Sequence, residues 1–252
     1  MKRVVLSLCF LLITLALFTG CGIDEYAYLL PIRGDEISLT ANTGAVVPIP
    51  NNDPTIFTNL IILYRIYMSN TDDQSPAPEN FRYINSALDS HYRSINVYNY
   101  TSDRVFSASN LDSLFINNGY KYLYLENIST HKILQMDDLN PSDVLNEKLI
   151  FNFPTNLSAG GPYPAMSITS GGNYNLLREQ QSGLNDISDR YFINNGELLK
   201  NNPADVNPNT AENANIAYVA MFIIAMGLND VEYTPIYSNP TLIHVFRLPS
   251  TL

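Results

Sequence analysis

The side chains best suited to metal chemistry are three histidines and one acidic loop. His91, His131 and His244 lie far apart in the sequence, and none has the His-x-x-x-His spacing of a zinc site. Residues 205–212 alternate oxygen-bearing side chains as a calcium loop does, but Thr210 stands where an EF-hand loop needs glycine, and the glutamate comes too early. We therefore expect structural or surface histidines, a turn-rich surface loop and no metal ligand.

Motifs for nucleophilic or phosphate chemistry are absent from the sequence. There is no Gly-x-Ser-x-Gly elbow, and the Gly-rich stretch 158–164 lacks the Gly-Lys-Ser/Thr of a phosphate loop. Asp137, Asp138 and Asp143 are typical of turns and helix caps. We therefore expect no enzyme, no catalytic residue and no cofactor. The alternative is a hydrolase of envelope or host polysaccharide with a carboxylate pair in the region 154–213, because such carboxylates can be distant in sequence.

The N-terminus carries the pattern of a lipoprotein signal. Lys2 and Arg3 precede an apolar run from Val4 to Phe18, and two small residues lead to Cys21. The run of about 15 residues is shorter than the roughly 20 that a membrane-spanning helix needs. The sequence therefore predicts a signal peptide over residues 1–20 and acylation of Cys21, which would hold the mature chain on a membrane. An uncleaved anchor and an ordinary secretory signal are the alternatives.

The five residues around the cleavage point also suggest a lineage. Phe18 stands where most lipoboxes carry Leu, Val or Ile, and the segment Leu17-Phe18-Thr19-Gly20-Cys21 resembles the relaxed lipobox of spirochaete lipoproteins. The resemblance implies a bacterial lipoprotein of the cell envelope, either periplasmic or exposed at the surface of the outer membrane. Gly22 follows the cysteine, where many lipoproteins retained at an inner membrane have Asp.

The charge of the chain excludes some partners. Loss of the signal removes two of the 14 basic residues, and against 24 acidic residues the formal charge moves from -10 to -12. Phosphate backbones repel such a chain, so we expect no nucleic-acid partner. Cys9 leaves with the signal and Cys21 carries the lipid, so no disulfide is expected. A hydrophobic content of 46% argues against disorder and for a packed core.

A two-residue period in the side-chain pattern predicts several strands. In the segment 59–68 one face is fully apolar and the other nearly so, which indicates a central strand. Alternation also predicts strands at 120–128 and 241–248. The apolar run 217–226 favours a buried strand, with a core helix as the alternative. The segment 26–32 looks like a first strand or a docking segment.

The period changes after the loop at 69–80. Apolar residues then recur three or four positions apart, which predicts an amphipathic helix over 81–95 with Asn80 as its N-cap. We expect its apolar face to pack on the second face of the sheet. The region 154–213 is rich in Gly, Pro and Asn and reads as a long irregular insertion, with a short helical candidate at 174–181.

Strand-dominated flanks around a helical interruption favour a β-sandwich in one domain, residues 21–252. Two segments resemble a fibronectin type III-like domain. Leu63-Tyr64-Arg65-Ile66-Tyr67 is similar to its tyrosine-rich central strand, and residues 237–245 are similar to the Ser-x-Pro segment before its last strand, although the tryptophan of that family is missing. We expect a mainly β, Ig or fibronectin type III-like sandwich with an inserted helix at 81–95 and the insertion at 154–213.

Together these patterns predict a membrane-anchored envelope lipoprotein that acts as a binding or structural module. Its partners would be the membrane, through the lipid, and an envelope or host protein. Tyr163, Tyr174 and Tyr191 belong to the side-chain type favoured at interfaces, so we expect the partner to contact the region 154–213. Removal of that region is expected to leave a folded sandwich.

Overall fold

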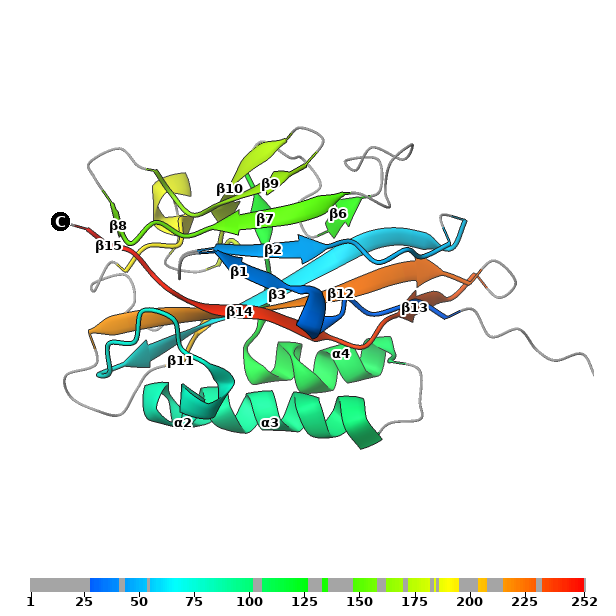
Figure 1. Cartoon of the computed structure of the whole chain (residues 1–252), viewed down its shortest axis with the longest axis horizontal. Coiled ribbons are helices and arrows are strands. Elements are labelled where there is room, and N and C mark those ends of the chain that lie inside the picture. The colour runs from blue at the N-terminus through cyan, green and yellow to red at the C-terminus, as the bar shows by residue number, and fades with distance from the viewer. Residues whose placement is uncertain are drawn as a thin grey trace, which may run out of the picture.

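The chain forms two β-sheets and a helical layer, stacked one on another (Figure 1). The structure is a computed structural model, and it describes residues 28–40, 44–53, 55–101, 106–126, 133–135, 147–157, 162–169, 172–181, 184, 186–194, 204–207, 215–229 and 233–251. Cys21, His131, Asp137, Asp138 and Asp143 lie outside these ranges.

The central sheet is built on two long antiparallel strands, β3 (Phe57–Ser69) and β12 (Ile216–Leu228), with Ile62 opposite Ile223. On the far side of β12 lie β14 (Thr241–Arg247) and β13 (Pro235–Tyr237). On the far side of β3 lie β4 (Lys121–Tyr122), β6 (Ile133–Gln135) and the parallel strand β11 (Val206–Asn207).

The second sheet, here called the outer sheet, packs on one face of the central sheet. Its strand order is β1 (Ser38–Thr40), β2 (Gly44–Pro48), β7 (Lys148–Asn152), β9 (Ala165–Ile168), β10 (Asn173–Leu177) and β5 (Tyr124–Leu125). A separate two-stranded parallel pair joins β8 (Asn156–Leu157) to β15 (Ser250–Thr251).

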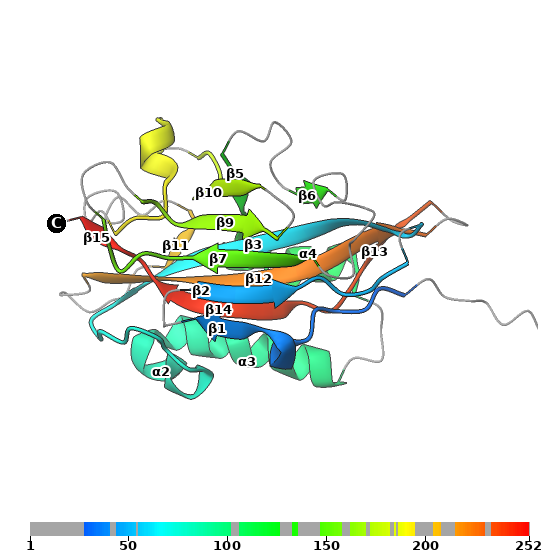
Figure 2. The same cartoon turned by 45° about the horizontal axis from the view of Figure 1, so that its top comes forward.

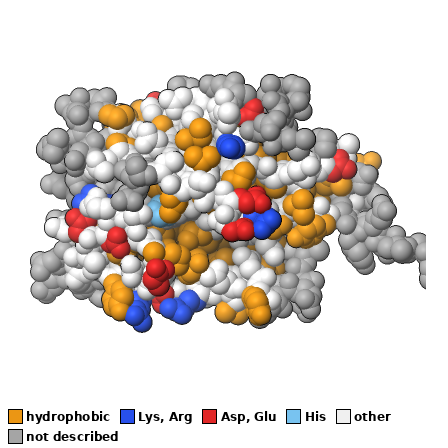
Figure 3. Space-filling model, viewed as in Figure 1, with side chains coloured by type: hydrophobic (Ala, Val, Ile, Leu, Met, Phe, Trp, Pro, Cys, Tyr) orange, Lys and Arg blue, Asp and Glu red, His pale blue; other side chains and the backbone are white. Residues whose placement is uncertain are grey.

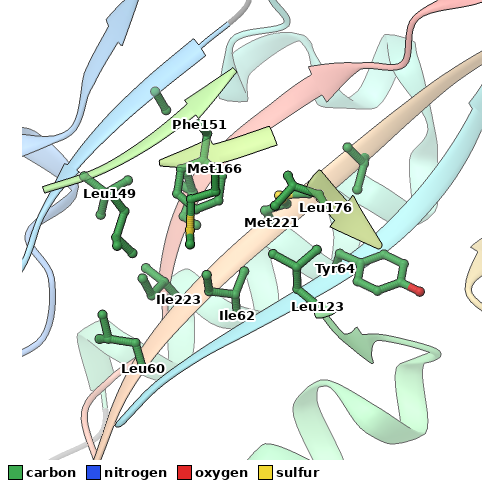
Figure 4. Packing of buried hydrophobic residues seen from close by; sticks show 14 of the residues in the cluster. Leu60, Ile62, Tyr64, Leu123, Leu149, Phe151, Met166, Leu176, Met221 and Ile223 are labelled. Carbon is green, nitrogen blue, oxygen red and sulfur yellow. The ribbon is translucent and has the colours of Figure 1, made fainter. Parts of the chain in front are cut away.

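Alternation along β3 explains why both of its faces are apolar. Leu60, Ile62 and Tyr64 point toward the outer sheet, where they meet Leu149 and Met166 (Figure 4). The residues between them, Ile61 and Leu63 among them, point to the helical layer. Each face of the central sheet therefore has its own hydrophobic core, and the strand has no solvated side.

In the part of the chain that the structure describes, the helical layer contains three α-helices, and it covers the second face of the central sheet (Figure 1). These are α2 (Phe81–Ile84), α3 (Ser86–Thr101) and α4 (Ala108–Leu114). Short 3-10 turns are η1 (Gly34–Glu36), η2 (Pro78–Asn80), η3 (Ile116–Asn118) and η6 (Ile187–Arg190). The packing of Phe81, Ile84, Leu88 and Ile95 on the sheet confirms the apolar stripe expected over 81–95.

The helix nevertheless breaks where the sequence suggested continuity. Asn85 is extended, and its side-chain oxygen accepts hydrogen bonds from the backbone N–H groups of Ala87 (2.9 Å) and Leu88 (3.4 Å). Asn85 is thus the N-cap of α3. The expected cap, Asn80, makes no side-chain capping bond. The amide of Asn85 also donates to the carbonyl of Met68 (3.0 Å), which ties the break to the central sheet.

The chain itself joins the two sheets along one side, whereas along the other side β14 lies close to β2 and β1 without pairing with them (Figure 2). On the joined side the chain leaves the central sheet at Leu123, whose N–H donates to Ile62 (2.8 Å), and enters the outer sheet as β5. On the other side lie β1 and β14, which do not pair with each other. We call this the open side of the sandwich, because no strand pairing closes it among the described residues.

The β-sandwich and the strands expected at 59–68, 217–226 and 241–248 are confirmed, and the helical alternative for 217–226 is wrong. The region 154–213 differs from the expectation because it supplies β9 and β10, which lie inside the outer sheet. It is not a removable insertion. The helix expected at 174–181 is wrong, since β10 pairs with strands on both sides. Residues 28–33 form no strand, but Leu29 and Ile32 are buried as a docking segment.

Candidate functional site

His91 and His244 are both part of the packing. The ring of His91, on α3, stacks on Tyr120 at 4.5 Å between centroids and contacts Phe115 and Phe222 edge-on. Burial, and secondarily the charge of Arg65, lowers the pKa of His91 to about 4. Burial alone lowers the pKa of His244 in β14 to about 4. Both rings are therefore neutral at pH 7, and the described residues contain no group of three metal-ligating side chains.

Asp205, the first residue of the calcium-like loop, is fully buried. Its two carboxylate oxygens accept from Nε (2.8 Å) and a terminal nitrogen (2.6 Å) of Arg178, which is also buried. The hydroxyl of Tyr64 donates to the same carboxylate (2.9 Å) and accepts from the N–H of Glu179 (2.8 Å). Asp205 is thus a structural anion, and the loop beyond Asn207 lies outside the described residues up to 214.

The tyrosines expected at an interface occupy two places. Tyr163 and Tyr191 stack face to face, with 3.9 Å between ring centroids and 8° between planes. Tyr174, in β10, packs partly buried against the core between the sheets. The region 154–213 therefore presents one rigid aromatic pair, and its third tyrosine helps to hold the sheet.

A groove of about 510 Å³ lies on the open side of the sandwich, between α3 and β14 (Figure 3). Four segments supply its walls: the stretch around η1 and β1, the loop before α2, one side of α3, and the central sheet. They are Gly34, Ile37, Leu39; Ser75, Pro76, Ala77, Pro78, Phe81; Tyr92, Ile95, Asn96, Asn99; and Phe222, Pro240, Thr241, Leu242, Ile243, His244.

None of these lining residues carries a charge at pH 7, in a chain whose formal charge is -10. The floor is aliphatic and aromatic, and the polar groups are amides, hydroxyls and the neutral ring of His244. Asn99 donates to the carbonyl of Pro240 (2.9 Å), while its own buried oxygen has no hydrogen-bond partner. The groove can therefore accept an uncharged occupant that brings hydrogen-bond donors.

The groove meets β14 at the edge of the strand. Thr241, Leu242, Ile243 and His244 are consecutive, and all four line it. Because successive side chains of a strand point to opposite faces, consecutive lining residues mean that the backbone itself borders the groove. β14 pairs only with β12, and in the described part of the chain its other edge makes no backbone hydrogen bond. Within the described residues, this edge thus offers a row of N–H and C=O groups without backbone partners.

Sequence reasoning missed the groove, because its walls come from segments that only the fold brings together. No protein-family model, characterised protein or solved structure was found to match the chain. In the part of the chain that the structure describes, no helix has both the length and the hydropathy that crossing a bilayer requires. The geometry of the site is therefore what supports a function.

Proposed function

We propose that this chain is a lipid-anchored protein of the bacterial cell envelope that binds an extended, uncharged segment of a partner protein. The anchor is Cys21. The binding site is the groove between α3 and β14. The observation that supports this most is the free edge of β14 along the groove, at Thr241–His244.

A strand is the natural occupant of a free strand edge. Main-chain hydrogen bonds to β14 would supply affinity, and alternate side chains of the bound segment would enter the apolar floor near Phe81, Tyr92 and Ile95. Extension of the central sheet at β14 would also cover part of the open side of the sandwich. A charged segment would lose its hydration in an uncharged groove, which favours neutral sequences.

The irregularity in β14 limits what else can pair there. The register of β14 against β12 shifts between Met221 and Phe222, so that Ile243 is an extra residue. A bulge twists the edge of a strand and interrupts a continuous ladder, and edges of this kind resist pairing with a second copy of themselves. The edge therefore favours a short segment over a long, self-complementary strand.

Gly34→Trp tests the groove. A Cβ added at Gly34, which lines the groove, would meet only the methyl group of Thr241, at 3.8 Å, so a side chain can be introduced there and the indole serves to block the groove. Peptides selected from a displayed random library on the purified chain should be uncharged, with apolar residues at alternate positions. Their affinity should fall at least tenfold in Gly34→Trp and stay unchanged in Asn51→Trp, an exposed loop control. Selected peptides that bind Gly34→Trp equally well would contradict the site.

Cys21→Ser tests the anchor. Without the thiol no acyl chain can be attached, so the variant should fail to incorporate labelled palmitate. It should also move to the aqueous phase of a detergent phase separation or retain its signal peptide. Incorporation of palmitate by the variant would show that the lipobox interpretation is wrong. The alternative of a polysaccharide hydrolase has no support from Asp205, which Arg178 and Tyr64 hold away from solvent.

A further inference from the structure

The solvent-facing side of the outer sheet carries a second hollow, which we call the outer trough. It has a volume of about 860 Å³ and lies over β7, β9 and β10. The sheet register places Gly44, Asn152, Ala165 and Asn175 side by side across four strands. The small residues Gly44 and Ala165 therefore alternate with the longer side chains of Asn152 and Asn175, and the surface is hollow where the side chains are short. At Gly44 an added Cβ would come within 3.0 Å of the Phe151 carbonyl oxygen, so the register itself requires glycine there.

The walls of the outer trough offer hydrogen bonds without charge. Among the described residues that line it, none is ionisable near pH 7. Asn152 and Asn173 are exposed, and their side chains make no hydrogen bond with the described part of the chain. A carboxamide both donates and accepts, so each of these groups can pair with a hydroxyl in either sense. The hydroxyls of Thr40 and Ser167 add to the same set.

One wall of the outer trough is a fixed aromatic ring. Tyr163 lines the trough and is stacked on Tyr191, so one of its faces is covered and the ring is held in place. The hydroxyl of Tyr191 donates to Glu126 (2.8 Å), whose other oxygen accepts from the amide of Asn175 (2.7 Å). The aromatic wall and one amide of the trough are therefore positioned by a single network.

We propose that the outer trough binds a neutral saccharide. Such a ligand presents hydroxyls to the amides of Asn152 and Asn173 and C–H groups to the ring of Tyr163. A peptide strand is disfavoured here, because β7 and β9 are paired on both sides and offer no free backbone edge. The absence of charged side chains among the described lining residues also disfavours an acidic polysaccharide. This site is distinct from the groove at β14.

Calorimetric titration of the purified full chain tests the proposal. The probes are cellohexaose, maltohexaose, chitohexaose and mannohexaose, with oligogalacturonate as the charged comparison. At least one neutral probe should bind. Its affinity should fall tenfold or more in Asn152→Ala, Asn173→Ala and Tyr163→Ala. Binding should be unchanged in Asn51→Ala, a loop control, and in Gly34→Trp, because Gly34 lines the groove and not the trough.

Three outcomes would overturn the saccharide site. They are no binding of any of the four neutral probes, tighter binding of oligogalacturonate, and affinities that all three trough substitutions leave unchanged. The trough variants replace exposed or partly exposed side chains, and circular dichroism with a thermal melt on each shows whether the fold is kept. Because Gly34→Trp affects the groove and not the trough, a negative result for saccharide binding would not count against the proposed peptide site.

Discussion

Arg178 and Asp205 form the most buried ion pair in the described structure, with side-chain exposures of 2% and 0%. Asp205→Ala would leave the guanidinium buried without its partner. We expect a loss of about 3–5 kcal/mol in the free energy of unfolding, measured by urea denaturation. Replacement of both residues, Arg178→Met with Asp205→Leu, should cost less than the single change. A single change that costs under about 1 kcal/mol would show that the pair is not essential.

His91 should make stability depend on pH. Its pKa is lowered from 6.5 to about 4 in the folded chain, so between those values the unfolded chain binds a proton that the folded chain does not. Stability is complete above pH 6.5 and falls as the pH drops toward 4, by up to about 3 kcal/mol for this residue. Urea denaturation of His91→Phe at pH 7 and pH 4.5 should show a smaller loss than the parent chain. Equal losses in both proteins would place the effect elsewhere, for example at His244.

At the scale of elements, two neighbouring residues of β9 have different roles, one in the core and one at the surface. Met166 is fully buried between the sheets, while its neighbour Ser167 faces the outer trough. Met166→Ala should cost about 2–5 kcal/mol of unfolding free energy. Ser167→Ala should stay within about 0.5 kcal/mol. Thermal or urea unfolding measures both changes in free energy. Equal, small losses for the two variants would mean that the region 154–213 does not form part of the packed sheet.

The break between α2 and α3 gives a second pair of matched changes. Asn85→Ala removes two capping hydrogen bonds and the bond to Met68, so we expect a loss of about 1–2 kcal/mol in urea denaturation. Asn80→Ala should have little effect, because that side chain makes no capping bond. A larger loss for Asn80→Ala than for Asn85→Ala would show that Asn80 is the functional N-cap.

The spacing of apolar residues predicted elements correctly where that spacing alone decides between strand and helix. The two-residue period of β3 and the helical stripe after Asn80 both predict elements that the structure contains. The pattern was wrong for β10, because Asn173–Leu177 is short and polar and becomes a strand only through pairing with β9 and β5. It also could not reveal that Asp205 meets Arg178, since that contact depends on tertiary packing.

At the scale of the whole molecule, the open side of the sandwich should be visible in amide hydrogen exchange. In β14 the N–H groups that bond to β12 should be protected, while those on the free edge should exchange rapidly, which gives an alternating pattern along Thr241–Arg247. Residue-resolved exchange by NMR measures it. Uniform protection along β14 would mean that another segment covers the edge, and the groove would then be closed to a partner.

The two candidate surfaces depend on the same arrangement, and neither could be predicted from the sequence. Leu39 lines the groove and Thr40 the outer trough, so neighbouring residues serve different surfaces. Sequence analysis predicted partner contacts in the region 154–213, and one of the tyrosines it named, Tyr163, lines the trough. It gave no sign of Gly34 or Asn99, because their significance comes from residues far along the chain.

The pairing of β3 with β12 has a consequence for the order of events during synthesis. Thr58 and Met226 touch across this pair although they are 168 residues apart. Closing so long a loop is slow, and β3 has no partner for its full length until nearly the whole chain has been made. A nascent chain of this kind stays without its central sheet during most of translation. That delay is compatible with the proposed export of the chain, because a polypeptide must stay unfolded while it passes through a translocation channel.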